Sequence, residues 1–144
     1  MDKIRLERLL ALQKMEATEA EVYRRLAMMQ SDPVNKAILE GIALEEERHE
    51  VFISEMTGRV VSPNRFQVMK QIILARIFGF TFSIMMMEST ENNIASEYRD
   101  LGLDDIAEEE EVHEENMISM LDEERIRYSG SIVLVMSDAL IELT

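Results

Sequence analysis

Residues 110–113 read Glu-Glu-Val-His and place a carboxylate and an imidazole three residues apart in a stretch with strong helical character. On a helix, side chains three residues apart lie on the same face. The pattern occurs once more, at residues 46–49, which read Glu-Glu-Arg-His. The two copies contain both histidines of the 144-residue sequence. A repeated Glu-x-x-His on two helices therefore dominates the interpretation of the fold.

A Glu-x-x-His from each of two helices, completed by one Glu from each of two other helices, is the inward-facing ligand set of di-iron carboxylate bundles. Glu16 is a candidate on one further helix, and Glu88 and Glu91 are candidates on another. The alternative is a pair of solvated acidic helix faces with exposed histidines, because 29 of the 144 residues are Asp or Glu.

Composition favours one mainly helical domain. Hydrophobic residues make up 47% of the chain, with only 5 Gly and 2 Pro, and we expect an all-α fold. The formal net charge of −14 argues against nucleic acid and favours cations as partners. The absence of cysteine excludes disulfides, zinc ribbons and a cysteine-held rubredoxin centre. The N-terminus lacks the apolar run of a secretory signal, so we expect a cytoplasmic domain.

Two long helices are predicted in the first 57 residues. Over residues 2–30, apolar side chains recur at three- and four-residue spacing, the mark of an amphipathic helix, and Glu16 lies within this stripe. Residues 31–33, Ser-Asp-Pro, offer capping side chains before a proline that suits a first helical turn. A second helix should start there and run to Thr57, with Gly58 ending it.

The stretch over residues 63–101 admits two arrangements. Ser62-Pro63 repeats the cap-then-proline signal, and residues 66–87 are apolar nearly all round. In the first arrangement, residues 59–78 form a long crossover that contains a helix of its own and leads to the third bundle helix. In the second, one unbroken helix of roughly 58 Å would be too long to fold back, and a helix-swapped dimer would result.

A fourth helix and an apolar tail complete the chain. Gly102 closes the preceding stretch, and Asp104 is expected to cap a helix that runs through Glu124. Residues 132–143 are twelve mostly apolar residues, too few to cross a bilayer, which needs about 20 residues. We therefore divide the chain into a helical domain, residues 1–128, and an apolar segment, residues 129–144, which could be the start of a membrane helix in a longer chain.

The candidate ligands lie at matching levels in two antiparallel helix pairs. Glu16 lies sixteen residues before the turn at Asp32, while Glu46 and His49 lie fourteen and seventeen residues after it. The other candidates lie at similar distances on either side of the turn at Gly102. Glu91 and Glu88 lie eleven and fourteen residues before it, and Glu110 and His113 lie eight and eleven residues after it. Scattered surface acids have no reason to match across both pairs, so we expect one metal site.

The expected ligand roles follow from charge and donor type. Four carboxylates neutralise two divalent cations, and oxygen donors with one imidazole per metal suit iron or manganese. The preferred assignment has bridging Glu46 and Glu110, one histidine on each metal (His49 and His113), and terminal Glu16 and Glu91. Glu88, one turn before Glu91, is a fifth carboxylate that could serve the oxidised pair, and Glu19 is an alternative to Glu16.

Two tyrosines are candidates for a supporting role. Tyr23 and Tyr98 each lie seven residues after a candidate ligand, two turns further along the same helix face. From there each hydroxyl could hydrogen-bond a ligand on a neighbouring helix. Packing in the core explains their positions equally well.

The combined pattern resembles the rubrerythrin branch of the ferritin-like superfamily over nearly the whole chain up to Arg127. The residues that carry the resemblance are Glu16 with Tyr23, Glu46-x-x-His49, Glu88-x-x-Glu91 and Glu110-x-x-His113. The carboxylate pair on the third helix is the more specific feature, since ferritins proper lack it. More narrowly, residues 75–98 and the ending 127–144 resemble proteins in which such a domain precedes a membrane domain similar to vacuolar iron transporters.

This resemblance implies a ferritin-like four-helix bundle that binds two iron ions and oxidises ferrous iron with oxygen or hydrogen peroxide. It also implies supply of iron to a membrane transport domain, on the cytoplasmic face of a membrane, if the native chain continues. The chain differs from rubrerythrin proper because it lacks a rubredoxin domain, which argues against a self-contained peroxidase. A non-catalytic iron sensor or chaperone and a metal-free acidic interaction module remain as alternatives. We further expect a homodimer, because residues 66–87 carry more apolar surface than one bundle can cover.

Overall fold

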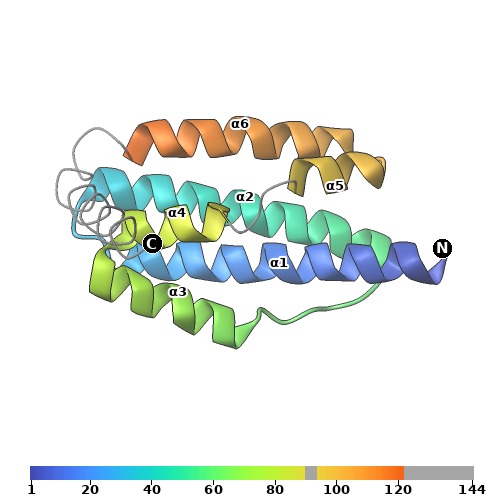
Figure 1. Cartoon of the computed structure of the whole chain (residues 1–144), viewed down its shortest axis with the longest axis horizontal. Coiled ribbons are helices and arrows are strands. Elements are labelled where there is room, and N and C mark those ends of the chain that lie inside the picture. The colour runs from blue at the N-terminus through green and yellow to red at the C-terminus, as the bar shows by residue number, and fades with distance from the viewer. Residues whose placement is uncertain (90–93, 122–144) are drawn as a thin grey trace, which may run out of the picture. The chain divides into compact units, whose positions relative to one another are not determined.

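A computed structural model of the protein describes residues 1–89 and 94–121, and within these it describes every side chain except those of 89 and 113–121. All regular secondary structure in these ranges is helical (Figure 1), which confirms the all-α prediction. The six helices are α1 (Lys3–Met28), α2 (Pro33–Thr57), α3 (Arg65–Phe78), α4 (Phe80–Ser89), α5 (Ile94–Asp100) and α6 (Asp104–Leu121). The chain divides into two compact units between Ile72 and Ile73.

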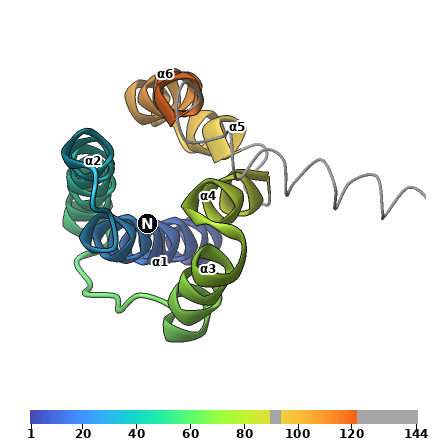
Figure 2. The ribbon, with the colours of Figure 1, turned by 90° about the vertical axis from the view of Figure 1, so that its left-hand side faces the viewer.

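The first unit is built on the antiparallel α1–α2 pair, whose helices lie side by side in both views (Figures 1 and 2). The Arg5 backbone N–H donates to the Asp2 side chain at 3.0 Å, so Asp2 caps α1. Asp32 caps α2 with Pro33 in the first turn, and Gly58 ends α2 in the left-handed region with φ of 66°. A glycine adopts this conformation without the strain a Cβ would cause. The predicted bounds of both helices are therefore confirmed to within two residues.

The core of this pair consists of the apolar stripes that the spacing predicted. One helix face of α1 and one of α2 are almost fully buried, so each helix is stabilised mainly by packing against other elements rather than by its own propensity. The large hydrophobic side chains buried in this pair are Leu9, Leu12, Val22, Tyr23, Leu26, Leu39, Ile42 and Ile53.

A buried glutamine fastens the end of α2 to α1. Gln13 on α1 is fully buried. Its Nε2 donates to the backbone carbonyl of Arg59 at 2.8 Å and to Glu50 Oε1 at 3.1 Å. Its Oε1 accepts a hydrogen bond from Thr57 Oγ1 at 2.8 Å. Both the donor and the acceptor group of this amide are thus satisfied, which a buried polar side chain requires.

The helix α3 starts at Arg65, two residues later than the Ser62-Pro63 signal predicted. Asn64 takes the capping role instead, because its Oδ1 accepts from the Gln67 backbone N–H at 3.2 Å. The backbone N–H of Asn64 in turn donates to Thr18 Oγ1 on α1 at 2.9 Å. The separate helix predicted within residues 59–78 is thus confirmed, while the role of this segment as a bundle crossover stays a prediction.

The helical stretch is interrupted at Gly79. The helix α3 ends at Phe78, α4 begins at Phe80, and Gly79 between them has φ of 96°. A right-handed helix cannot pass through this conformation, so the alternative of one unbroken helix over residues 63–101 is wrong. The rings of Phe78 and Phe82 pack across the break with centroids 4.9 Å apart.

The second unit contains a helix pair formed by α5 and α6. Gly102 joins them with φ of 79°, and the Leu103 N–H donates to the Tyr98 carbonyl at 2.8 Å, as in a helix C-terminal cap. Asp104 is the first residue of α6 rather than its cap, so the capping prediction is off by one position. Arg99 Nη1 contacts Glu111 Oε1 at 2.6 Å; this hydrogen bond lowers the pKa of Glu111 and raises the pKa of Arg99.

The predicted end of the last helix at Glu124 and the apolar segment 129–144 lie outside the described residues. Within the described ranges, no helix combines the length and the apolar character that spanning a membrane requires.

Candidate metal centre

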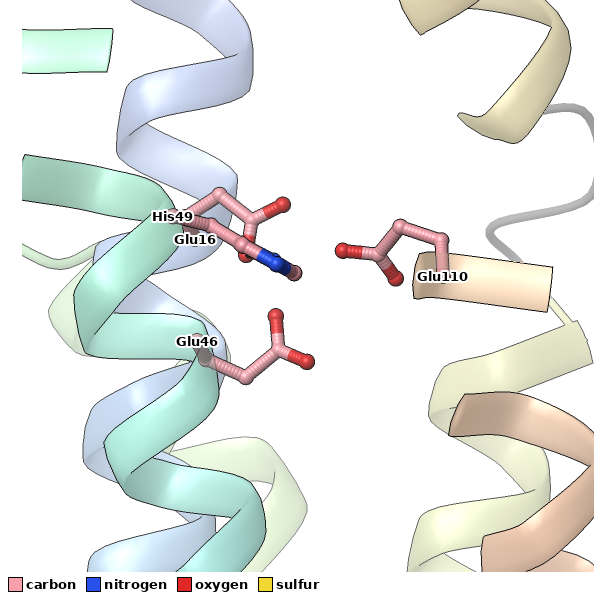
Figure 3. A group of neighbouring side chains, drawn as sticks. All are labelled: Glu16, Glu46, His49 and Glu110. Carbon is pink, nitrogen blue, oxygen red and sulfur yellow. Dashed lines mark ion pairs between the residues drawn. The ribbon is translucent and has the colours of Figure 1, made fainter. Parts of the chain in front are cut away.

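The α1–α2 pair gathers three of the predicted ligands on one side. Glu16 extends from α1, and Glu46 and His49 extend from α2 toward the same side of the pair (Figure 3). The exposed fraction is 0% for Glu16 and 2% for each of Glu46 and His49. The solvated-face interpretation is therefore wrong for this Glu-x-x-His copy.

The local sequence explains why these charged residues are buried. On α2, Ile42, Glu46, His49 and Ile53 follow one another at three- and four-residue spacing, so the two polar side chains occupy the buried stripe between two isoleucines. On α1, Glu16 takes the equivalent place in the stripe that also holds Leu12. Helix geometry alone then brings the polar side chains of both helices inward.

The distances within the group suit a shared cation. His49 Nδ1 lies 3.7 Å from Glu16 Oε2. Each of the three residues also offers one ligand atom within 4.8 Å of the others. Two atoms bound to one first-row metal at about 2.1 Å can lie at most about 4.2 Å apart. The histidine–glutamate pair already meets this limit, and small side-chain movements would bring the third ligand within it.

The acids on the outer face of the same helices are arranged differently. Glu47, next to Glu46 in sequence, is exposed and lies 3.2 Å from Arg24 of α1. Arg24 also contacts Glu21 at 2.8 Å, and Arg25 contacts Glu21 at 2.9 Å. Burial by itself would raise the pKa of Glu21, but the hydrogen bonds and charges of Arg25 and Arg24 outweigh it and hold that pKa below its ordinary value. These outer carboxylates are paired with arginine, whereas the inner ones converge with an imidazole.

The donor set is compatible with divalent cations. Two carboxylates and one imidazole provide oxygen and nitrogen ligands without sulfur, which iron, manganese and zinc all accept. A divalent cation would offset the two negative charges, which are costly to hold together away from water. The group is therefore compatible with the binding of a divalent cation.

The remaining predicted ligands belong to the second unit, and the structure describes them only in part. Glu110 on α6 and Glu88 on α4 are half-buried. The backbone of His113 lies in α6, but its side chain is outside the described part, as is all of Glu91. Their predicted roles stay predictions.

The predicted supporting residues are both buried. Tyr23 on α1 and Tyr98 on α5 have no exposed surface. Burial is expected for a residue that supports a ligand and equally for one that packs in the core, so it does not separate the two interpretations.

The structure also separates Glu16 from its alternative. Glu19 is buried on the same helix, yet among the described residues it is Glu16 that joins the group with Glu46 and His49. Sequence reasoning missed Gln13, which secures α2 to α1 one turn before Glu16. Its signal was available, because a polar residue next to Leu12 falls within the apolar stripe.

The described part of the chain thus defines a class: an all-helical protein with a buried carboxylate–imidazole group on an antiparallel helix pair. Comparison of the chain with protein-family models, with curated proteins and with solved structures gave no match. The functional interpretation therefore depends on the residues of this chain.

Proposed function

We propose that the protein is a di-iron carboxylate protein of the rubrerythrin-like branch of the ferritin-like superfamily, which binds ferrous iron and oxidises it with oxygen or hydrogen peroxide. The observation that carries the proposal is the buried convergence of Glu16, Glu46 and His49. An exposed acidic cluster is common without a metal, but a helix pair that buries two carboxylates and an imidazole together has a charge to compensate.

The second half of the proposed site comes from the repeated sequence pattern. Glu110 and His113 repeat the spacing of Glu46 and His49, and Glu88 and Glu91 supply the carboxylates that correspond to Glu16. With both halves, four to five carboxylates and two imidazoles would hold two iron ions in a four-helix arrangement. Manganese has similar ligand preferences and would compete for the same site.

In this proposal the protein groups have defined tasks. The carboxylates of Glu16 and Glu46 would hold the iron and would favour its higher-charged oxidised form over ferrous iron, since Coulomb attraction grows with charge. His49 would contribute an imidazole nitrogen ligand. Each of two ferrous ions gives up one electron; hydrogen peroxide takes up both electrons and two protons, its O–O bond breaks and two waters form. The iron would then be supplied to a membrane transport domain.

An anaerobic titration with ferrous iron, followed by air or peroxide, tests the proposal directly. We expect about two iron ions per chain, by elemental analysis, and an absorbance change on oxidation that saturates at the same stoichiometry. His49→Ala should weaken iron binding at least about a hundredfold, because removal of even an outer-shell partner costs 10–100-fold. Glu47→Gln is the matched control, since this exposed neighbour faces Arg24, and it should bind iron like the unmodified chain.

The outcomes separate the competing functions. Consumption of oxidant well beyond one equivalent per site supports catalysis. Binding of iron with no turnover would favour an iron sensor or chaperone instead. Less than half an equivalent of iron per chain, or equal iron content in His49→Ala and the unmodified protein, would refute the site and leave the metal-free interaction module.

A further inference from the structure

Among the residues that the structure describes, α3 has one buried and one exposed apolar face. Val68, Ile72 and Ala75 recur at helical spacing and are buried. On the other side, four large apolar side chains are exposed: Phe66, Met69, Ile73 and Ile77. Single exposed apolar residues are ordinary on protein surfaces, but four that follow one helix face form a continuous strip.

Basic side chains border this strip on both sides. At about 100° per residue, the four apolar side chains of the strip fall within an arc of about 80°. Arg65 and Arg76 lie about 20–40° beyond one edge, and Lys70 lies about 20° beyond the other. All three cations are exposed. Long basic side chains in these positions can keep their charge in water while their stems extend along an apolar phase.

The charge of this region is opposite to that of the chain as a whole. Residues 56–87 contain four basic residues and no acidic residue, in a sequence whose formal net charge is −14. Arg65 Nη1 lies 4.0 Å from Glu21 Oε1 of α1, so this cation is partly offset. Charges more than about 8 Å away are largely screened at physiological ionic strength, so Lys70 and Arg76 contribute most of the positive charge next to α3. An apolar strip with cationic borders is the pattern of helices that lie in the plane of a membrane surface.

We propose that the exposed face of α3 binds the surface of an anionic lipid bilayer. Phe66, Met69, Ile73 and Ile77 would enter the boundary between headgroups and acyl chains, while the flanking cations contact the anionic headgroups. A symmetric contact with a second copy through the same face fits less well, because it would set the three cations of one chain against the three of the other. An anionic bilayer would bury the apolar strip and would also pair the cations with its headgroups.

Flotation of the full chain with vesicles tests this proposal without iron, so its result is independent of the metal site. We expect binding to vesicles of phosphatidylcholine mixed with phosphatidylglycerol, at least tenfold weaker binding to phosphatidylcholine alone, and weakening by salt. Replacing the three cations by Gln should reduce binding to the anionic vesicles roughly a hundredfold. The double variant Phe66→Gln/Ile73→Gln should reduce it at least tenfold.

The control is a second pair of exposed apolar residues with the same seven-residue spacing. Leu44 and Val51 lie exposed on α2, and Leu44→Gln/Val51→Gln should bind vesicles like the unmodified chain. Circular dichroism of each variant confirms that it is folded. Every variant keeps residues 122–144, so vesicle binding that survives both sets of α3 substitutions would overturn the proposal.

Sedimentation without vesicles tests whether a second copy of the chain, rather than a bilayer, binds the exposed face of α3. If the α3 variants abolish a dimer of the unmodified chain and no form of the protein binds vesicles, the face is an interface between copies and the proposal is wrong. Equal binding to neutral and anionic vesicles would also overturn it, since the cations would then have no role.

Discussion

The α1–α2 pair and the helix α3 depart from the ordinary distribution of side chains in opposite ways. The pair buries charged groups, Glu16 and Glu46, in the middle of its apolar stripes. The helix α3 leaves large apolar groups, such as Phe66 and Ile73, on its surface. Each departure costs stability in an isolated chain, because buried charges lose their hydration and exposed apolar groups retain theirs. Under our two proposals the regions would therefore gain stability from different partners, a cation for the first and an apolar phase for the second.

The two faces of α3 provide the largest test of this contrast. Ile72 is 7% exposed and its neighbour Ile73 is 49% exposed. Ile72→Ala should lower the free energy of unfolding by about 2–4 kcal/mol, since it removes buried methyl groups and leaves a cavity. Ile73→Ala should change it by no more than about 0.5 kcal/mol. Urea denaturation midpoints measure both, and equal losses would mean that the strip on α3 is covered.

The buried acid in the α1–α2 pair is tested by Glu46→Gln. Without metal, this neutral isostere removes one of two neighbouring negative charges, so the melting temperature should rise, by the equivalent of about 1 kcal/mol. Iron at 100 times its Kd should stabilise the unmodified chain by about 2.7 kcal/mol and the variant much less. Glu47→Gln loses only a surface ion pair and should respond to iron normally. A Glu46→Gln protein that is destabilised without metal yet gains fully from iron would remove Glu46 from the site.

Gly41 within α2 and Gly58 at its C-terminal end distinguish helix propensity from backbone strain. Gly58 has φ of 66°, which a side chain disfavours, and Gly58→Ala should destabilise the protein by about 1 kcal/mol. Gly41 lies inside α2, and a Cβ added there meets nothing within 4 Å. Gly41→Ala should therefore stabilise by about 0.5–1 kcal/mol through helix propensity. Thermal denaturation of the two variants should show shifts of opposite sign; two shifts of the same sign would contradict the αL cap.

The outer carboxylates give the smallest effect, and it depends on pH. Because the pKa of Glu21 is lower in the folded protein than in the unfolded chain, its pairing with Arg25 and Arg24 stabilises the fold above the unfolded value. That stability is lost as the pH falls through the folded value. Glu21→Gln should cost at most about 1 kcal/mol at neutral pH and progressively less in acid. Urea denaturation of both proteins at several pH values checks this; a cost that does not change with pH would exclude an ionic origin.

Local signals predicted the first two helices well and the third region poorly. The helix caps Asp2, Asp32 and Gly58 contact residues close to them in the sequence. The ends of these helices can therefore be predicted from local sequence. The start of α3 was predicted two residues early, because the contact that secures Asn64 comes from Thr18, far away in the chain. The break at Gly79 was ambiguous for a related reason. A glycine in an apolar run can continue a helix or end it, and only its φ decides.

The candidate site was predictable where periodicity alone places a side chain. Glu16, Glu46 and His49 occupy apolar stripes of two adjacent helices, so their burial and proximity follow from spacing. The choice of Glu16 over Glu19 was less secure, because both acids lie on the inner side of α1 and one helical turn separates them. That choice depends on the rotation of α1 against α2, which three-dimensional packing sets.

The connection between α2 and α3 has a practical consequence for work on this protein. Gln13 is hydrogen-bonded to Arg59 at the start of this connection, and Thr18 is hydrogen-bonded to Asn64 at its end. Val60, between Arg59 and Asn64, is 98% exposed. The free energy of closing a loop rises only slowly with its length, so a short peptide inserted beside Val60 should be tolerated by both neighbouring helices. Since the chain has no cysteine, a single Val60→Cys substitution would also accept one thiol-reactive fluorophore at a defined place. Because hydrogen bonds to α1 hold both ends of this connection, Val60 is a good attachment point for a spectroscopic reporter.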